Sequence, residues 1–166
     1  MDWRQMIVDS YGNVGRILER VLDGLSQDEL DEQPKPECNS IGWLTWHLTR
    51  WQDRSVAELT GTEQLWIKDK WNEKFNRPAD PEDTGLGHTP EDLKAFKSPD
   101  VQTLLGYHNE VLKRMKSYLS GLSETDLGRD LGNPRVPTVG ARLTGILGDS
   151  LQHTGQVAYV KGLLKS

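Results

Sequence analysis

The stretch 62–97, TEQLWIKDKWNEKFNRPADPEDTGLGHTPEDLKAFK, separates two pairs of apolar helical segments and is far longer than neighbouring antiparallel helices need. A connection of this length can run the whole length of a helix bundle, so the helices on either side of it are expected to be parallel. It can be a plain crossover or, as long ordered connections often are, the cover of a site. Within it, TPEDLKAF predicts a short helix capped by Thr89, with Asp92 completing a capping box.

Outside this stretch, apolar residues recur at alternating steps of three and four, which is the spacing of one face of a helix. Four segments have this spacing: residues 3–25, 41–60, 98–119 and 139–164. No alternating strand pattern accompanies them. The sequence therefore predicts an all-α fold, a four-helix bundle of up-down-down-up order, in a single domain spanning residues 1–166.

Residues that favour helix ends flank these segments. Asn39 or Ser40 can cap the second segment, and Thr138 can cap the fourth. Ser98 is expected to cap the third, with Pro99 in its first turn, where the missing N–H costs nothing. The boundaries of all four helices are therefore predicted to within a few residues.

A weak internal repeat relates the two halves of the chain. LDGLSQDEL at residues 22–30 recurs as LSGLSETDL at residues 119–127, and each copy precedes a proline-containing loop and a long helix. The two helical hairpins are therefore expected to be duplicated halves related by a pseudo-twofold axis, although chance can also produce similarity of this extent.

Charge and composition exclude several classes of function. The formal net charge is −5 and no run of Lys or Arg occurs, which argues against a nucleic-acid partner. No apolar stretch is long enough to cross a membrane, and the first residues lack the layout of a signal peptide. The single cysteine, Cys38, excludes an internal disulfide, so we expect a cytoplasmic protein. With nucleic acid and membrane disfavoured as partners, a small-molecule substrate is expected.

The histidines are the main candidates for chemistry. His47, Asp149 and His153 lie near the apolar stripes of the second and fourth segments, and the last two are four residues apart on one helix face. Histidines from facing helices joined by such a pair can form a metal site in a bundle. The alternative is an ordinary hydrogen-bonded pair of acid and histidine. His88, in a loop between glycine and proline, is expected to be solvated.

Three further residues are candidate site residues with structural alternatives. His108 can be an acid–base group in the pocket or a buried structural histidine. Gln156 can orient a ligand or complete the helix face, and Arg50 can attract an anionic group or belong to an exposed basic edge. Trp43 and Trp46 flank His47 and are expected to point away from it.

Two stretches carry a family resemblance. NSIGWLTWHLTRWQD at 39–53 and DSLQHTGQVAYVKGLL at 149–164 resemble the DinB-like superfamily, whose relatives include DinB/YfiT metalloenzymes, bacillithiol transferases and mycothiol-dependent maleylpyruvate isomerase. The resemblance covers almost the whole chain. The common pattern has a third histidine where this sequence has Asp149, while the mycothiol-dependent branch is similar in having a carboxylate there.

The resemblance implies one divalent metal ion held by His47, Asp149 and His153. Zinc or nickel is the first choice, with iron or manganese as alternatives. It further implies a metal-dependent enzyme, an S-transferase or isomerase that uses a low-molecular-weight thiol. A metal-dependent hydrolase and a non-enzymatic small-molecule-binding or stress-response bundle are the alternatives. A homodimer is also expected, with tryptophans as apolar anchors of its interface.

Overall fold

The computed structural model describes residues 2–165, and within them every element is a helix apart from one isolated bridge between Asp130 and Thr138. The helices are α1 (Trp3–Leu22), α2 (Gln27–Asp31), α3 (Ile41–Thr60), α4 (Leu65–Lys68), α5 (Trp71–Lys74), α6 (Pro90–Ala95), α7 (Val101–Ser120), α8 (Glu124–Leu127) and α9 (Val139–Leu164). The all-α prediction is confirmed. No helix in this part of the chain is both long and apolar enough to span a membrane.

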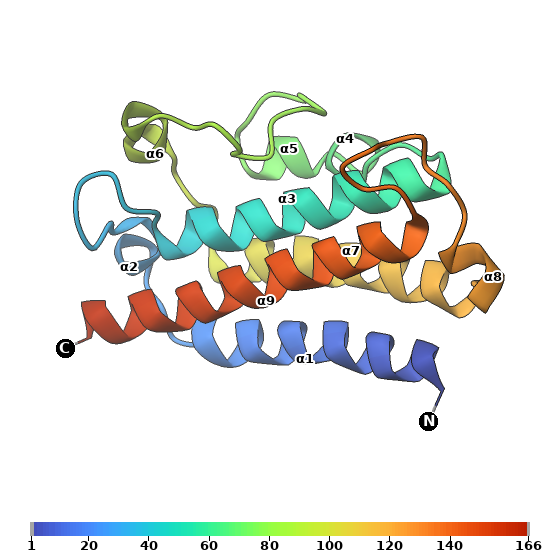
Figure 1. Cartoon of the computed structure of the whole chain (residues 1–166). Coiled ribbons are helices and arrows are strands. Elements are labelled where there is room, and N and C mark those ends of the chain that lie inside the picture. Colours follow the sequence, from blue (N-terminus) through green and yellow to red (C-terminus); the bar gives the residue numbers. More distant parts are fainter. Residues whose placement is uncertain (1, 166) are drawn as a thin grey trace.

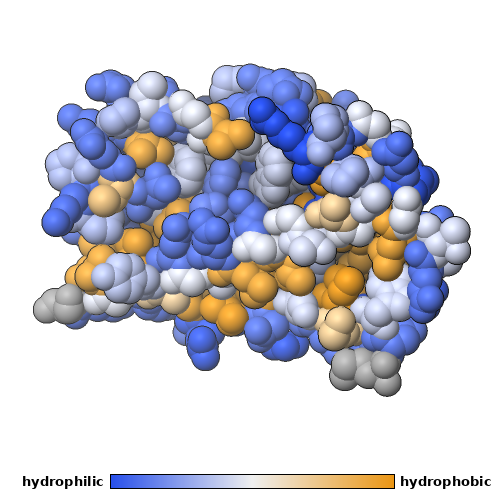
Figure 2. All heavy atoms as spheres, viewed as in Figure 1, coloured by the Kyte–Doolittle hydropathy of each residue, from blue (hydrophilic) through white to orange (hydrophobic). Residues whose placement is uncertain are grey.

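The long helices α1, α3, α7 and α9 pack against one another. α3 contacts α7 and α9, and α1 contacts the same two helices. Figure 1 shows α3 and α7 running in one direction and α1 and α9 in the other. The crossover that carries α4, α5 and α6 runs along the outside of α3 before α7 begins (Figure 1). Its surface is mostly hydrophilic, whereas hydrophobic residues gather in a band over α9 and α1 (Figure 2).

Most predicted helix ends agree with the structure. The hydroxyl of Ser40 accepts a hydrogen bond from the Trp43 amide, and Thr138 caps α9 in the same way. Gly61 ends α3 in the left-handed conformation, at φ 66°, which glycine adopts without strain. α1 ends earlier than predicted, at Leu22, because the chain turns away through Gly24 at φ 71°.

The predicted start of α7 is wrong by two residues. Asp100, and not Ser98, caps the helix, and its carboxylate accepts a hydrogen bond of 2.7 Å from the Thr103 amide. Ser98 is instead held by the short helix α2, because its amide donates to the Asp31 carboxylate over 2.7 Å. Ser98 and Asp100 both favour helix caps, and the hydrogen bond of Ser98 to Asp31 is a long-range contact that the local sequence does not indicate.

Both copies of the sequence repeat form a short helix after a long one. Ser26 and Glu29 make a capping box on α2, and Ser123 and Asp126 make the equivalent box on α8. The predicted capping box of α6, formed by Thr89 and Asp92, is also present. The repeat thus corresponds to a repeated local structure.

The core is divided into two hydrophobic clusters along the bundle. On α3, one cluster contains Leu44 and Leu48 and the other contains Val56 and Leu59. On α9, Ile146 belongs to one cluster and Val157 to the other. The buried residues between these positions are polar or charged: besides Arg50 and Asp53, they are Thr49, Gln52 and Ser55 on α3, and Ser150 and Thr154 on α9. The uncharged ones form a group of their own. We call these five residues the polar layer.

Arg50, on α3, binds the crossover through hydrogen bonds. Its guanidinium is fully buried, donates to the backbone carbonyls of Asp80, Pro81 and Asp83, and lies over the Trp66 ring at 4.7 Å. Arg50 therefore does not belong to an exposed basic edge. It supplies positive charge and hydrogen-bond donors to three carbonyls of the loop, one of which, that of Pro81, also accepts a hydrogen bond from Gln64.

Candidate metal centre

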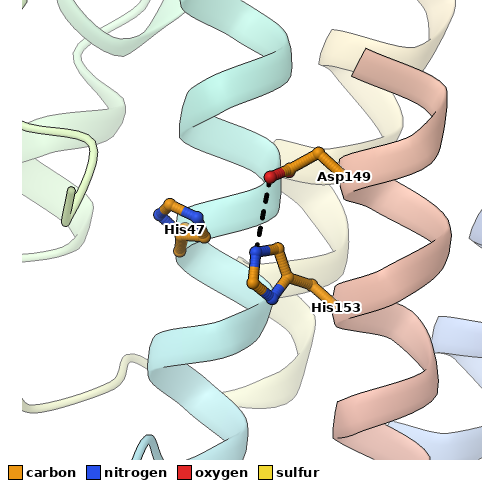
Figure 3. A group of neighbouring side chains, drawn as sticks. All are labelled: His47, Asp149 and His153. Atoms are coloured by element: carbon orange, nitrogen blue, oxygen red, sulfur yellow. Dashed lines mark ion pairs between the residues drawn. The ribbon is translucent and has the colours of Figure 1, made fainter. Parts of the chain in front are cut away.

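His47, Asp149 and His153 meet between α3 and α9, as Figure 3 shows. One ligand atom from each lies within 4.8 Å of the others. The imidazole rings of His47 and His153 are 4.7 Å apart and nearly perpendicular, and His153 Nε2 lies 3.4 Å from Asp149 Oδ1. The three residues predicted from the sequence as metal ligands are thus brought together in space.

The His47 ring is fixed by the crossover. Its Nδ1 lies 2.5 Å from the backbone carbonyl oxygen of Thr84. A carbonyl can only accept, so Nδ1 carries the proton and Nε2 keeps its lone pair. Burial, as the main cause, holds the pKa of His47 below its ordinary value. The ring is therefore neutral near pH 7, which is the form that binds a metal ion.

The His153 ring is fixed by its own helix. Its Nδ1 lies 2.6 Å from Gln156 Oε1, so this nitrogen donates, and Nε2 is the nitrogen that can bind a metal ion once its proton is lost. Burial by itself would lower the pKa of His153, but the hydrogen bonds to Asp149 and Gln156 outweigh it and raise the pKa. Gln156 thus contacts His153, and its role in orienting a ligand stays a prediction.

Asp149 completes a donor set that fits a divalent ion. Its Oδ2 is buried and has no hydrogen-bond partner among the described residues. A buried carboxylate oxygen without a partner costs free energy unless a cation or a donor satisfies it. Two neutral imidazole nitrogens and one carboxylate suit zinc, nickel, iron or manganese, and they leave further coordination positions open.

The crossover encloses His47 on the side away from α9. Trp43 stacks on the His47 ring at 4.8 Å, and its indole N–H donates to His88 Nδ1 over 3.1 Å. His88 Nε2 in turn lies 3.0 Å from Asp83 Oδ1. Gly85 is required here, because a side chain at its φ of 88° would lie within 3 Å of Trp43 and Trp46.

Two expectations about this region are therefore wrong. Trp43 does not point away from His47, since it stacks on that ring, whereas Trp46 is buried against other aromatic rings. His88 is not a solvated residue, because both of its ring nitrogens have partners. The contacts of His47 with Trp43 and with the Thr84 carbonyl were missed from the sequence, and a backbone carbonyl leaves no side-chain signal.

His108 and Arg50 are not brought to the cluster. His108 is fully buried, and its Nδ1 lies 3.3 Å from the Thr49 hydroxyl, which itself donates to the Thr45 carbonyl. Burial lowers its pKa to about 4. The structure thus places His108 in the core, and Arg50 is used by the crossover, so neither contacts the three candidate ligands.

Comparisons with known proteins agree with this architecture. The sequence model of the DinB superfamily matches residues 13–157. A crystal structure of a conserved protein from Enterococcus faecalis is similar, with a TM-score of 0.90 and 29% identity, over 98% of this chain and 97% of that one. No curated protein matches the chain. The family match covers most of the sequence, and the chain therefore belongs to the DinB superfamily.

Proposed function

We propose that the protein is a metal-dependent enzyme whose single divalent ion is held by His47, Asp149 and His153. The observation that carries the proposal is the convergence of three side chains whose possible ligand atoms lie within 4.8 Å of one another. Both histidines use Nδ1 as a donor elsewhere, and Asp149 has a buried oxygen without a partner. Zinc or nickel is the proposed ion, with iron or manganese as alternatives.

We propose that the reaction is an S-transfer or isomerisation that uses a low-molecular-weight thiol. A bound ion supplies Lewis-acid stabilisation of an anionic nucleophile, either thiolate or hydroxide. The negative charge of Asp149 lowers the net positive charge at the site, compared with three histidines. A thiol is about seven pK units more acidic than water, so a weaker Lewis acid still suffices for a thiolate. This favours a thiol over water as the nucleophile.

Two other functions remain alternatives to the thiol enzyme. A hydrolase would use water at the same position, and carboxylate-containing zinc hydrolases exist. A non-enzymatic bundle would use the Asp149–His153 pair only as a structural contact, at 3.4 Å. Metal content separates the non-enzymatic bundle from the two enzymes. Thiol dependence then separates the thiol-dependent enzyme from the hydrolase.

Elemental analysis of the purified protein tests the metal site. We expect about one divalent ion per chain in the wild type and a large loss in His153→Ala. The matched control is Gln152→Ala, because Gln152 is exposed on the same helix and should leave metal content unchanged. Equal metal content in the wild type and His153→Ala, or no metal in either after metal-supplemented expression, would refute the site.

A panel of thiols tests the reaction. Metal-loaded protein is incubated with a model electrophile and with mycothiol, bacillithiol, glutathione or no thiol. We expect turnover that requires both the ion and one of the thiols. Turnover that requires the ion but is equally fast without any thiol would establish hydrolysis instead.

We further propose that the scaffold is a single-domain, up-down-down-up four-helix bundle that forms a homodimer. Four of the expected tryptophan anchors, Trp43, Trp46, Trp66 and Trp71, are buried, which leaves Trp3 and Trp51 as the partly exposed ones. The exposed apolar side chains that support a dimer surface are on α9, where Leu151 is 46% and Tyr159 is 68% exposed.

A further inference from the structure

A small pocket opens directly beside the candidate metal centre. It has a volume of about 230 Å³ and lies between α3, α9 and the loop that leads into α9. Its lining residues are Trp51, Val136, Ala141, Arg142, Gly145, Ile146 and Asp149. A larger hollow of about 440 Å³ lies by α4 and α7, but none of its lining residues is a candidate ligand.

Helix geometry places this pocket one turn from the three donors. Trp51 follows His47 by four residues on α3, and Gly145 precedes Asp149 by four residues on α9, so each pair shares a helix face. Asp149 itself lines the pocket. A molecule in the pocket would therefore have one end at the metal centre.

The guanidinium of Arg142 lies at the other end of the pocket. The Arg142 guanidinium lies 6.0 Å from the Trp51 ring, and its Nη2 is 3.2 Å from Glu58 Oε2. Glu58 is also paired with Arg54 at 3.2 Å, and Arg54 in turn lies 2.7 Å from Glu82 Oε2, so that two cations and two carboxylates form one network. A guanidinium has five N–H donors, and a second carboxylate can be bound beside Glu58.

The walls between these ends are flat and apolar. Trp51 is half-buried, so part of its indole is available to a ligand, and Ile146 adds an aliphatic surface. Gly145 leaves space, because a Cβ at this position would meet nothing within 4 Å. The volume is smaller than the pockets that hold drug-sized ligands.

We propose that this pocket binds the electrophilic substrate, and that the substrate is a small, flat, unsaturated or aromatic carboxylate. Its carboxylate pairs with Arg142, its planar body lies along Trp51, and its reactive end lies at Asp149. The negative charge of Asp149 sets this orientation, because it repels a second carboxylate at its own end. This inference rests on the proposed function for the reaction, but binding itself requires only the pocket.

The test uses trans-cinnamate as the probe, with uncharged cinnamamide for comparison. Affinities are measured by calorimetry, and the indole N–H signals are followed by NMR, in metal-free and zinc-loaded protein. In both forms we expect cinnamate to bind at least about tenfold more tightly than cinnamamide, because one charge-assisted hydrogen-bonded pair is lost in the amide. The Trp51 indole signal, assigned with Trp51→Phe, should shift with either probe.

Three variants should change probe binding in three different ways. Arg142→Gln should abolish the preference for cinnamate, whereas Glu58→Gln should strengthen it by removing a competing carboxylate. Gly145→Leu should block both probes by filling the pocket, and its far-UV circular dichroism should match the wild type because Gly145 has open space around it.

Several results would overturn the proposal. They are equal affinity for the two probes in metal-free protein, an undiminished preference in Arg142→Gln, and unimpaired binding in a folded Gly145→Leu. Cinnamate binding that appears only with zinc would place the carboxylate on the ion instead. Because metal content and thiol-dependent turnover are measured separately, this inference and the proposed function can fail independently.

Discussion

Replacing Asp53 by alanine is expected to lower the free energy of unfolding by about 3–5 kcal/mol, the usual cost of breaking a buried ion pair by removing one partner. Asp53 is fully buried on α3. Its carboxylate accepts hydrogen bonds from the amides of Leu65 and Trp66, at 3.0 and 2.8 Å, and so caps α4 from another helix. The Tyr107 hydroxyl donates to it as well, over 2.8 Å.

The magnitude follows from what the substitution leaves behind. Arg50 is 3.8 Å from Asp53 and 0% exposed, so it would remain as a buried cation without its carboxylate. Its bonds to loop carbonyls and to Gln64 would soften the loss, as would the cation–π contact with Trp66. Asp53→Asn should cost less than Asp53→Ala, because the amide oxygen can still accept one of the hydrogen bonds. It should still cost some stability, because the amide N–H2 group would face a hydrogen-bond donor.

Urea unfolding followed by circular dichroism measures the effect. Glu73→Ala is the matched control, since Glu73 is 63% exposed and its one ion pair within residues 2–165 is with Lys70, at 3.4 Å. It should change stability by less than about 0.5 kcal/mol. A loss below about 1 kcal/mol for Asp53→Ala, at unchanged m-value, would show that the buried Arg50–Asp53 contact is not needed to hold the crossover.

Three further predictions concern a buried histidine, a positioning side chain and assembly. The pKa of His108 is about 4 in the folded protein, so the unfolded chain binds a proton more readily, and the free energy of unfolding should fall by up to roughly 3 kcal/mol as the pH drops from 6.5 to 4. In His108→Leu the free energy of unfolding, measured across this pH range, should fall less than in the wild type. Parallel pH curves for the two proteins would contradict the prediction. Gln156→Ala should weaken zinc affinity in competition titrations by about 10–100-fold, because His153 loses the acceptor that fixes its ring. The control Gln152→Ala should leave zinc affinity unchanged. Equal zinc affinities in the two variants would show that Gln156 does not orient His153. Light scattering at micromolar concentrations should give the mass of a dimer, and a monomer mass would refute the homodimer.

The helices and one part of the candidate metal centre could be predicted from the sequence because they depend on short-range spacing. A step of three or four residues fixes which side chains share a helix face, and this placed Asp149 and His153 together. His47 lies on a different helix, and its approach depended on the resemblance to a family as well as on its position on α3. Local capping residues such as Ser40 and Thr138 likewise fixed helix ends without tertiary information.

The errors about individual side chains involve the crossover, whose path has no periodic signal. Arg50, Trp43 and His88 looked exposed because each has a polar or amphipathic side chain and the chain that covers it is remote in sequence. Each is in fact satisfied by residues 80–88 or by Trp43 itself. Long-range partners of this kind depend on where a loop lies, and no local pattern encodes that.

The polar layer in the middle of the bundle has a thermodynamic consequence. Its hydroxyl and amide groups bury little apolar surface, so the hydrophobic effect stabilises the contact of α3 with α9 less at this level than at the two ends. The proposed ion would join the same two helices here, and its binding free energy would add to that of folding. The metal-free chain would then spend more time unfolded and be degraded faster, so the amount of protein in a cell would follow the supply of metal.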